Sequence, residues 1–461
     1  MAIESAAALA NNLNAMNKKC SRLRPSIDQI RNTLKTYERS RRPRSKEICD
    51  TANLTTRLEA ESNFLFEMMV SYVVPRGGDL PVDVFCQLVM GATKLDFLPL
   101  PEKSFRGKMP FQPGKNGNRS LLGRILHAIP LLGIFFIAHF IISTLTSQVY
   151  SFNVENTFST ESGNFITQTI LNRLNWICKQ ASLSPLLSLK YNEKREMVGL
   201  FADIVPLQII WSVESFRRGN ALTVATISTL FWIIGQWKGI GYIAPIYYFF
   251  HYIQSPLEKY SAPDNRLIPT KYAKTLVAAV TVGYIVPTIF NLAGVSLLTK
   301  DFVDAMWYLF PLWTSITHHT FASLIMDTTA RDRISNPESD MPYLRVAYAF
   351  GAAIGGITHA SLWITTFGNL GVVLRNLIYA KEPLEQLVIY HYLITFVSGF
   401  IWLFLHLHAL KKDGRLETGW VKIIGVLGCT TLVFGPGAGL IAGWAWREEI
   451  LARHSTNITK S

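Results

Sequence analysis

The stretch ILHAIPLLGIFFIAHFIISTLTS, residues 125–147, decides the fold class of this chain. Its 23 residues include no Asp, Glu, Lys or Arg. At a rise of about 1.5 Å per residue, a helix of this length crosses the hydrocarbon core of a bilayer, which is about 30 Å thick. A surface helix of a soluble protein would alternate apolar and polar faces, and this stretch does not. It therefore predicts a transmembrane helix.

Comparable apolar stretches recur from here almost to the end of the sequence. The predicted spans are residues 125–147, 198–215, 220–237, 239–255, 272–298, 303–326, 343–367, 386–409 and 419–446. The third and fourth are joined only by a short turn at Trp237–Gly239, and a re-entrant pair there would lower the count. We therefore predict an all-α fold, a polytopic transmembrane bundle of about eight or nine helices, in residues 121–450.

Glycine pairs four residues apart occur in two of these spans. Gly351 and Gly355 form one pair, and Gly435 and Gly439 form the other. Small residues at this spacing let two helix backbones approach closely. The spacing predicts tight helix–helix packing in the seventh and ninth spans.

Residues 1–120 differ in composition from the rest. The net charge of the chain is +13, and more than half of it lies here, in runs such as Arg39, Arg41 and Arg42. Beside a membrane domain, such charge is typical of the cytosolic side and of contact with anionic lipid rather than with nucleic acid. We interpret residues 1–120 as a basic cytosolic extension and linker, and 451–461 as a polar tail.

The basic loops predict the orientation. Arg217, Arg266, Arg331 and Lys411 follow alternate spans, so all four fall on the same side as the N-terminal region. The positive-inside tendency places that side in the cytosol. Because the first residues lack an apolar signal segment, we expect the first span to act as an uncleaved anchor in the endoplasmic reticulum.

Two carboxyl groups lie within the second predicted span. A charged side chain inside a bilayer costs roughly 2.5–3.5 kcal/mol and needs a reason. Asp203 and Glu214 are eleven residues apart, which puts them on nearly the same helix face about 16 Å apart along the axis. They predict a buried acid or a proton path. The structural alternative is that Glu214 pairs with Arg217 or Arg218 at the cytosolic boundary.

The sixth predicted span has a polar stripe at helical spacing. Its members are Asp304, Trp307, Pro311, Thr314 and His318, and Asp327 lies on a neighbouring stripe with His319 and Ser323. Either the stripe lines a site, or Asp304 caps the helix start and Asp327 pairs with Arg331.

Metal and disulfide chemistry are not indicated. The five cysteines form no CxxC pair, and His318-His319 lacks the further histidines of a di-iron box. We expect no metal and no cofactor.

Three segments resemble a known family. They are WSVESFRRGN at 211–220, GIGYIAPIYY at 239–248 and FPLW at 310–313. With them, residues 122–450 resemble the fungal integral-membrane terpene cyclases of meroterpenoid pathways, of the macrophorin and ascochlorin/ascofuranone kind. The resemblance implies cyclisation of a farnesyl chain attached to a polyketide-derived ring, after protonation of a terminal olefin or an epoxide.

The residues suit that chemistry. Protonating an alkene needs a carboxylic acid that burial keeps protonated, and the cation that forms needs a dry pocket with aromatic faces. Asp203 has no nearby cation, so it is the better donor, and Glu214 beside two arginines is the better orienter or terminal base; Asp304 and Asp327 are the next candidates. The residues expected to bind the isoprenoid substrate are Trp211, Tyr247, Trp307, Trp313 and His318.

Other functions remain open at this point. A transporter or proton-coupled carrier would use the same acids as an ion path. A membrane prenyltransferase would need paired acids for magnesium, which Asp301 and Asp304 only approximate, and a scaffold protein would use the aromatic residues for packing alone. An enclosed pocket with a buried acid would favour the cyclase, and a continuous polar path would favour transport.

Overall fold

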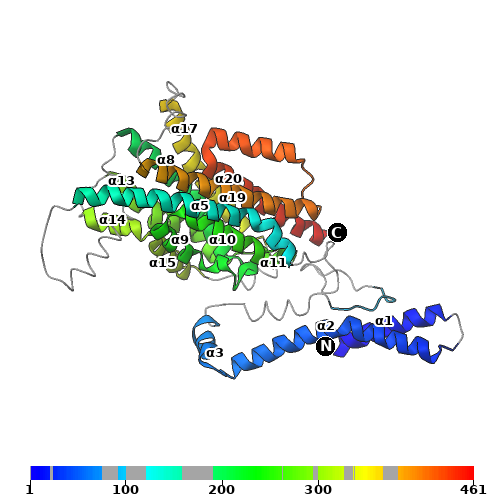
Figure 1. Cartoon of the computed structure of the whole chain (residues 1–461). Helices are drawn as coiled ribbons and strands as arrows, with labels where there is room; N and C mark the ends of the chain where they lie inside the picture. Colours follow the sequence, from blue (N-terminus) through cyan, green and yellow to red (C-terminus); the bar gives the residue numbers. More distant parts are fainter. Residues whose placement is uncertain are drawn as a thin grey trace. The chain divides into compact units, whose positions relative to one another are not determined.

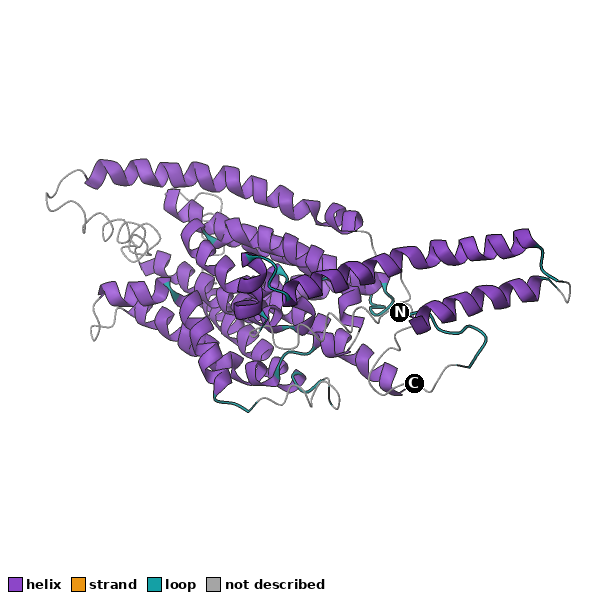
Figure 2. Ribbon diagram, turned by 90° about the horizontal axis from the view of Figure 1, so that it is seen from below, coloured by secondary structure: helices purple, strands orange, loops and turns teal. Residues whose placement is uncertain are grey.

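A computed structural model describes most of the chain. The described residues are 2–20, 24–74, 92–99, 121–157, 191–261, 263–293, 300–326, 336, 338–366 and 383–460. All regular structure in these ranges is helical (Figure 2). The chain divides into two compact units, Met1–Gly117 with Ile458–Ser461, and Asn118–Asn457.

The first unit is built on two packed helices, α1 (Ala2–Lys19) and α2 (Ile27–Glu59), drawn in blue in Figure 1. Ser26 starts α2 with a capping box, in which its hydroxyl accepts from the backbone N–H of Gln29. Glu4 of α1 ties the two helices together, since its carboxylate lies 2.6 Å from Arg41 and 2.7 Å from Arg44 of α2. The short helices α3 (Phe64–Met68) and η1 (Met69–Val73) follow.

The second unit is a helical bundle. Its long helices are α5 (Leu121–Thr157), α8 (Tyr191–Phe216), α17 (Met341–Thr366), α19 (Pro383–Lys412) and α20 (Trp420–Lys460). The shorter ones are α9 (Ser228–Lys238), α10 (Ile240–Gln254), α12 (Thr270–Val280), α13 (Val286–Ala293), α14 (Lys300–Tyr308) and α15 (Phe310–Ser323). Helices α5, α10 and α19 pack on one another, α8 packs on α17, and α12 packs on α15 (Figure 1).

Five helical segments of the described chain are long and apolar enough to cross a membrane. They are Leu121–Ser147, Val198–Phe216, Thr270–Leu292, Gln386–Lys412 and Trp420–Ala452. They coincide with the first, second, fifth, eighth and ninth predicted spans, so the all-α fold with membrane-length helices is confirmed. Five is fewer than the eight or nine spans predicted.

Breaks in the helical backbone shorten the third, fourth and sixth predicted spans, whereas the seventh is the unbroken helix α17 of 26 residues. The third and fourth become α9 and α10, of 11 and 15 residues, which meet at Gly239 with φ 93°. The sixth is divided at Leu309 into α14 and α15. The ninth continues as α20 to Lys460, so most of the predicted polar tail is helical. The helix is kinked at Gly435, whose φ is 88°.

The glycine pairs do permit close packing, as predicted. A Cβ atom on Gly351 would lie 2.7 Å from Ile441 and 2.9 Å from Ile209. On Gly439 it would lie 2.2 Å from Thr431, within the kinked helix α20 itself. At Gly351 the seventh span therefore packs closely against side chains of α8 and α20.

Candidate active site

Asp203 lies where four helices of the bundle meet. It belongs to α8, and its side chain is buried. Tyr392 of α19 donates a hydrogen bond of 2.5 Å to Asp203 Oδ2. Added Cβ atoms on Gly355 of α17 and Gly437 of α20 would lie 3.0 and 2.5 Å from Asp203 Oδ1, so both helices pack against the carboxyl group. None of the ion pairs found between described residues involves Asp203.

Glu214 has very different surroundings, although it lies on the same helix. Arg217 donates from Nε to both carboxylate oxygens at 3.1 Å and from Nη2 to Oε1 at 3.0 Å. Asn220 donates to Oε2 at 2.7 Å, and His251 Nε2 lies 3.3 Å from the same oxygen. Hydrogen bonds from this many donors stabilise the ionised carboxylate, which can only accept. Glu214 thus forms the ion pair that the structural alternative anticipated.

The Glu214 ion pair is part of a larger buried cluster. Arg217 Nη2 lies 2.5 Å from Glu448 of α20. Arg266 lies 2.8 Å from the other oxygen of Glu448 and 2.6 Å from Asp340. Burial lowers the pKa of Arg266, but Asp340 and Glu448 raise it more, so it stays above its ordinary value. The cluster fastens the ends of α8 and α20 to two connecting segments.

The buried arginines bear on the orientation argument. Arg217 and Arg266 were counted among the basic residues that face the cytosol, yet both are only 1% exposed. Arg217 Nη1 also donates to the backbone carbonyl of Arg266 at 2.8 Å, so the two loops meet at the same place. Their charges are balanced inside the protein, and the orientation itself stays a prediction.

His251 is held in one tautomer. Trp402 Nε1, which can only donate, lies 3.2 Å from His251 Nδ1. Nδ1 is therefore an acceptor, and the proton is on Nε2, from which it is donated to Glu214. This neutral histidine connects the ionic cluster to the aromatic core.

Most of the predicted substrate-binding aromatic residues are packed against other rings. Trp211 and Tyr247 are fully buried and stacked on each other, with centroids 3.9 Å apart. Trp307 is buried beside Phe201 and donates to Thr288 Oγ1 at 3.1 Å. Trp313 is half-buried. Their role in binding stays a prediction.

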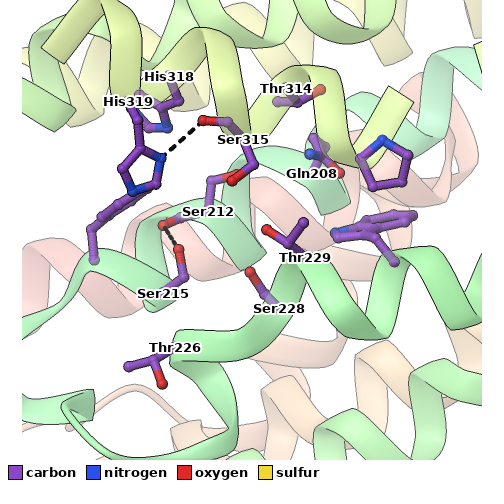
Figure 3. A pocket seen from close by; sticks show the side chains of 13 residues that line it. Gln208, Ser212, Ser215, Thr226, Ser228, Thr229, Thr314, Ser315, His318 and His319 are labelled. Atoms are coloured by element: carbon purple, nitrogen blue, oxygen red, sulfur yellow. Dashed lines mark hydrogen bonds between the residues drawn. The ribbon is translucent and has the colours of Figure 1, made fainter. Parts of the chain in front are cut away.

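A polar pocket of about 120 Å³ lies between α8, the segment 226–232 and α15 (Figure 3). It is lined by Gln208, Ser212, Ser215, Phe216, Thr226, Ser228, Thr229, Trp232, Pro311, Thr314, Ser315, His318 and His319. His318, predicted to bind substrate, is therefore a wall of this pocket, and its Nε2 bonds the backbone carbonyl of Tyr272 at 2.9 Å. The pocket contains no carboxyl group, so it is not the acid-containing chamber expected for a cyclase.

Two predicted acids cannot be assigned a geometry. Asp304 lies in α14, but its side chain is outside the described set, and Asp327 is outside the described residues altogether. Sequence reasoning missed Tyr392, Asp340 and Glu448. Glu448 was visible as a charged residue at the end of an apolar span, whereas nothing near Tyr392 or Asp340 in the sequence indicates their partners.

The fold and site define a class of protein: a helical bundle with membrane-length helices around a buried carboxyl group. Residues 193–391, from α8 to α19, match the family described as CtvD domain. This match and the relatives below confirm the resemblance to the fungal meroterpenoid cyclases.

The relatives are fungal enzymes. The chain is 31% identical to FAD-dependent monooxygenase BOA8 of Botryotinia fuckeliana (strain B05.10), over 98% of this chain and 55% of that protein. It is 30% identical to FAD-dependent monooxygenase verC1 of Penicillium polonicum, over 99% of this chain and 59% of that protein. It is 32% identical to terpene cyclase ascI of Acremonium egyptiacum, over 35% of this chain and 40% of that protein. The chain thus spans little more than half the length of the first two, and no solved structure matches it.

Proposed function

We propose that the chain is a membrane-bound terpene cyclase. Its substrate is a farnesyl chain on a polyketide-derived ring, and it acts in the endoplasmic reticulum membrane with the N-terminal unit in the cytosol. The observation that carries this proposal is the position of Asp203, a buried carboxyl group bonded to Tyr392 Oη and to none of the arginines. The terpene cyclase among its relatives supports the reaction class.

Asp203 is the proton donor in this proposal. A buried carboxyl group without a cationic partner is disfavoured in its charged form, and only the neutral form has a proton to give. Its O–H bond breaks as the proton adds to the terminal alkene carbon or the epoxide oxygen. The resulting cation is attacked by the next C=C electron pair, and each attack closes a ring. Loss of a proton from the last cation ends the sequence, and a proton returns to Asp203 from solvent or from this step.

Glu214 supports the site without donating a proton. Its oxygens accept from Arg217, Asn220 and His251, so it is fixed as a carboxylate. We assign it a structural role at the end of α8, where it stabilises the helix that carries Asp203. The role of terminal base would require an unoccupied carboxylate oxygen, and both oxygens of Glu214 already accept hydrogen bonds from Arg217, Asn220 and His251.

The test is cyclisation in microsomes that contain the full chain. Epoxidised and unepoxidised farnesyl-phenols are supplied in parallel, and cyclic products are measured. We expect Asp203→Asn to slow cyclisation by about 10²-fold or more, as loss of a general acid does. Tyr392→Phe removes the hydrogen bond but leaves the acid, so it serves as the milder matched variant. Wild-type turnover by an Asp203→Asn protein that inserts normally would refute the assignment.

Monooxygenation is the second candidate, because the relatives that match along nearly the whole chain are named FAD-dependent monooxygenases. Those proteins are longer than this chain, and their names describe the whole proteins. The same microsomes, given unepoxidised substrate, NADPH and FAD, separate the two. Formation of epoxide that depends on this chain would favour the second candidate.

A further inference from the structure

The pocket between α8 and α15 is a cavity that the proposed acid chemistry does not use. Its α8 residues Gln208, Ser212 and Ser215 lie about 120–180° around the helix axis from Asp203, at about 100° per residue. Asp203 contacts α17, α19 and α20, whereas the pocket is formed with α9 and α15. The pocket and the acid therefore lie on different faces of α8.

The lining of the pocket is polar, and its two histidines are its only readily ionisable side chains. Ten of its thirteen residues have a hydroxyl, an amide or an imidazole, and none is Lys, Arg, Asp or Glu. A buried ion without a counter-charge is costly, so an anion such as a diphosphate does not suit it. The occupant that suits it is neutral and can form hydrogen bonds.

Some of these polar atoms have no partner within the protein. Three buried side-chain atoms have no hydrogen-bond partner: Gln208 Oε1, Trp232 Nε1 and Thr314 Oγ1. Gln208 Oε1 only accepts and Trp232 Nε1 only donates. Buried groups of this kind are normally satisfied, and each one left open costs about 1–3 kcal/mol. An occupant with a hydroxyl group can accept from the indole and donate to the amide.

Two hydroxyls of the pocket lining already have partners within the protein. Ser215 donates to the carbonyl of Ser212 at 2.8 Å, and Thr226 donates to that of Thr223 at 2.7 Å. Figure 3 shows the labelled side chains of the three segments facing a common space, with His319 bonded to the Ser315 carbonyl. The buried lining atoms without a partner are those of Gln208, Trp232 and Thr314, while Thr226 and His319 are exposed.

Size and surroundings narrow the occupant further. The volume of about 120 Å³ is close to that of a cavity which holds one benzene ring, or to about four waters. Trp232, Phe216 and His318 supply flat faces for a ring. The same segments also carry exposed apolar residues outside the pocket, Ile227, Leu230, Leu312 and Ile316. A ring in the pocket would therefore have an apolar surface beside it for an attached chain.

We infer that this pocket binds the neutral, hydroxylated aromatic ring of a membrane-soluble compound that carries an apolar chain. The inference does not rest on the proposed function, because the pocket and its neighbouring apolar residues lie on a different face of α8 from Asp203. It is a separate ring-binding site, built from Gln208, Trp232 and Thr314.

Binding is tested on the purified full-length chain in detergent, with a radiolabelled alkylresorcinol bearing a fifteen-carbon chain. We expect saturable binding that Gln208→Leu and Trp232→Phe each weaken about tenfold, the effect of one lost hydrogen bond of about 1.4 kcal/mol. Trp237→Phe is the matched control on the same helix, since Trp237 is exposed and outside the pocket. A long-chain alkanol without a ring should bind at least tenfold more weakly.

A second measurement uses the unaltered protein. His319 is exposed at the pocket wall, so the bound ring should protect it from diethylpyrocarbonate, as read by peptide mass spectrometry. Absence of saturable binding, equal binding of the alkanol, or wild-type affinity in both variants would overturn the inference, and the pocket would then hold only water. Ring binding that persists in Asp203→Asn while cyclisation is absent in the wild type would reject the proposed function alone.

Discussion

Arg217 and Glu448 are 231 residues apart in the sequence, and their side chains meet at 2.5 Å, with no exposure to solvent. Arg217 directly follows the last residue of α8, and Glu448 lies in the C-terminal half of α20. Through them, and through Arg266 and Asp340, four parts of the chain are joined in one ionic cluster. The cluster sets the position of the helix that carries Asp203.

Glu448→Gln should destabilise the bundle strongly. Removing one member of a buried ion pair leaves its partners uncompensated, at a cost of about 3–5 kcal/mol. The adjacent Glu449→Gln is the control, because its partner Arg345 is 58% exposed and such pairs contribute about 0–1 kcal/mol. Thermal unfolding of both variants in detergent measures the difference. Equal melting temperatures would contradict a structural role for the cluster.

Glu214→Gln and Asp203→Asn should separate stability from chemistry. Glu214 accepts bonds from three residues, so its amide variant should lower the melting temperature and reduce cyclisation only in proportion to lost protein. Asp203→Asn keeps the shape of a group bonded to one tyrosine and should melt near the wild type while it loses turnover. The reverse pattern would make Glu214 the donor.

Gly437→Ala should damage the acid site specifically. The new methyl group would lie 2.5 Å from Asp203 Oδ1 and 3.0 Å from its Cα, which forces α8 and α20 apart at a cost of about 1–3 kcal/mol. Gly428→Ala on the same helix meets nothing within 4 Å and should be neutral or slightly stabilising. Cyclisation rates and melting temperatures of the two variants test this, and unchanged turnover in Gly437→Ala would place the reacting acid elsewhere.

The predicted orientation can be tested with single cysteines in a cysteine-free background. Position 266 is unsuitable, because Arg266 is buried. Glu417 is exposed in the connection after α19, near Lys411 and Arg415, and should react with an impermeant maleimide on sealed microsomes. Position 169 lies between the first and second predicted spans, in a connection that the same orientation places in the lumen, so it should react only after permeabilisation. The opposite labelling pattern would show that the bundle has the inverse orientation in the membrane.

Deletion of residues 2–100 should leave detectable cyclisation. The first unit has its own internal contacts, including the ion pairs of Glu4 with Arg41 and Arg44, and the acid site lies wholly in the second. Product formation per inserted protein is the measurement. Complete loss with normal insertion would show that the first unit takes part in the reaction.

Several features could be read from local sequence because their causes are local. An apolar run as long as residues 125–147 forms a helix wherever it lies in lipid, and the five helices of membrane length follow from that rule. The close packing at Gly351 and Gly355 can be predicted from the sequence because it is the lack of a side chain that lets the helices approach. The breaks at Gly239 and Leu309 were harder to predict, since the apolar run continues through both and only the backbone angles change.

The sequence by itself determined the helical fold, the family resemblance and the two carboxyl groups on α8. It could not decide their chemistry, because burial and ion pairing depend on residues that are distant along the chain. Only the tertiary structure brought Glu448 to Arg217 and His251 to Glu214, and left Asp203 with Tyr392 between four helices. A carboxyl group is an acid or an ion-pair partner according to the charges packed around it, and those neighbours are set by the packing of the bundle.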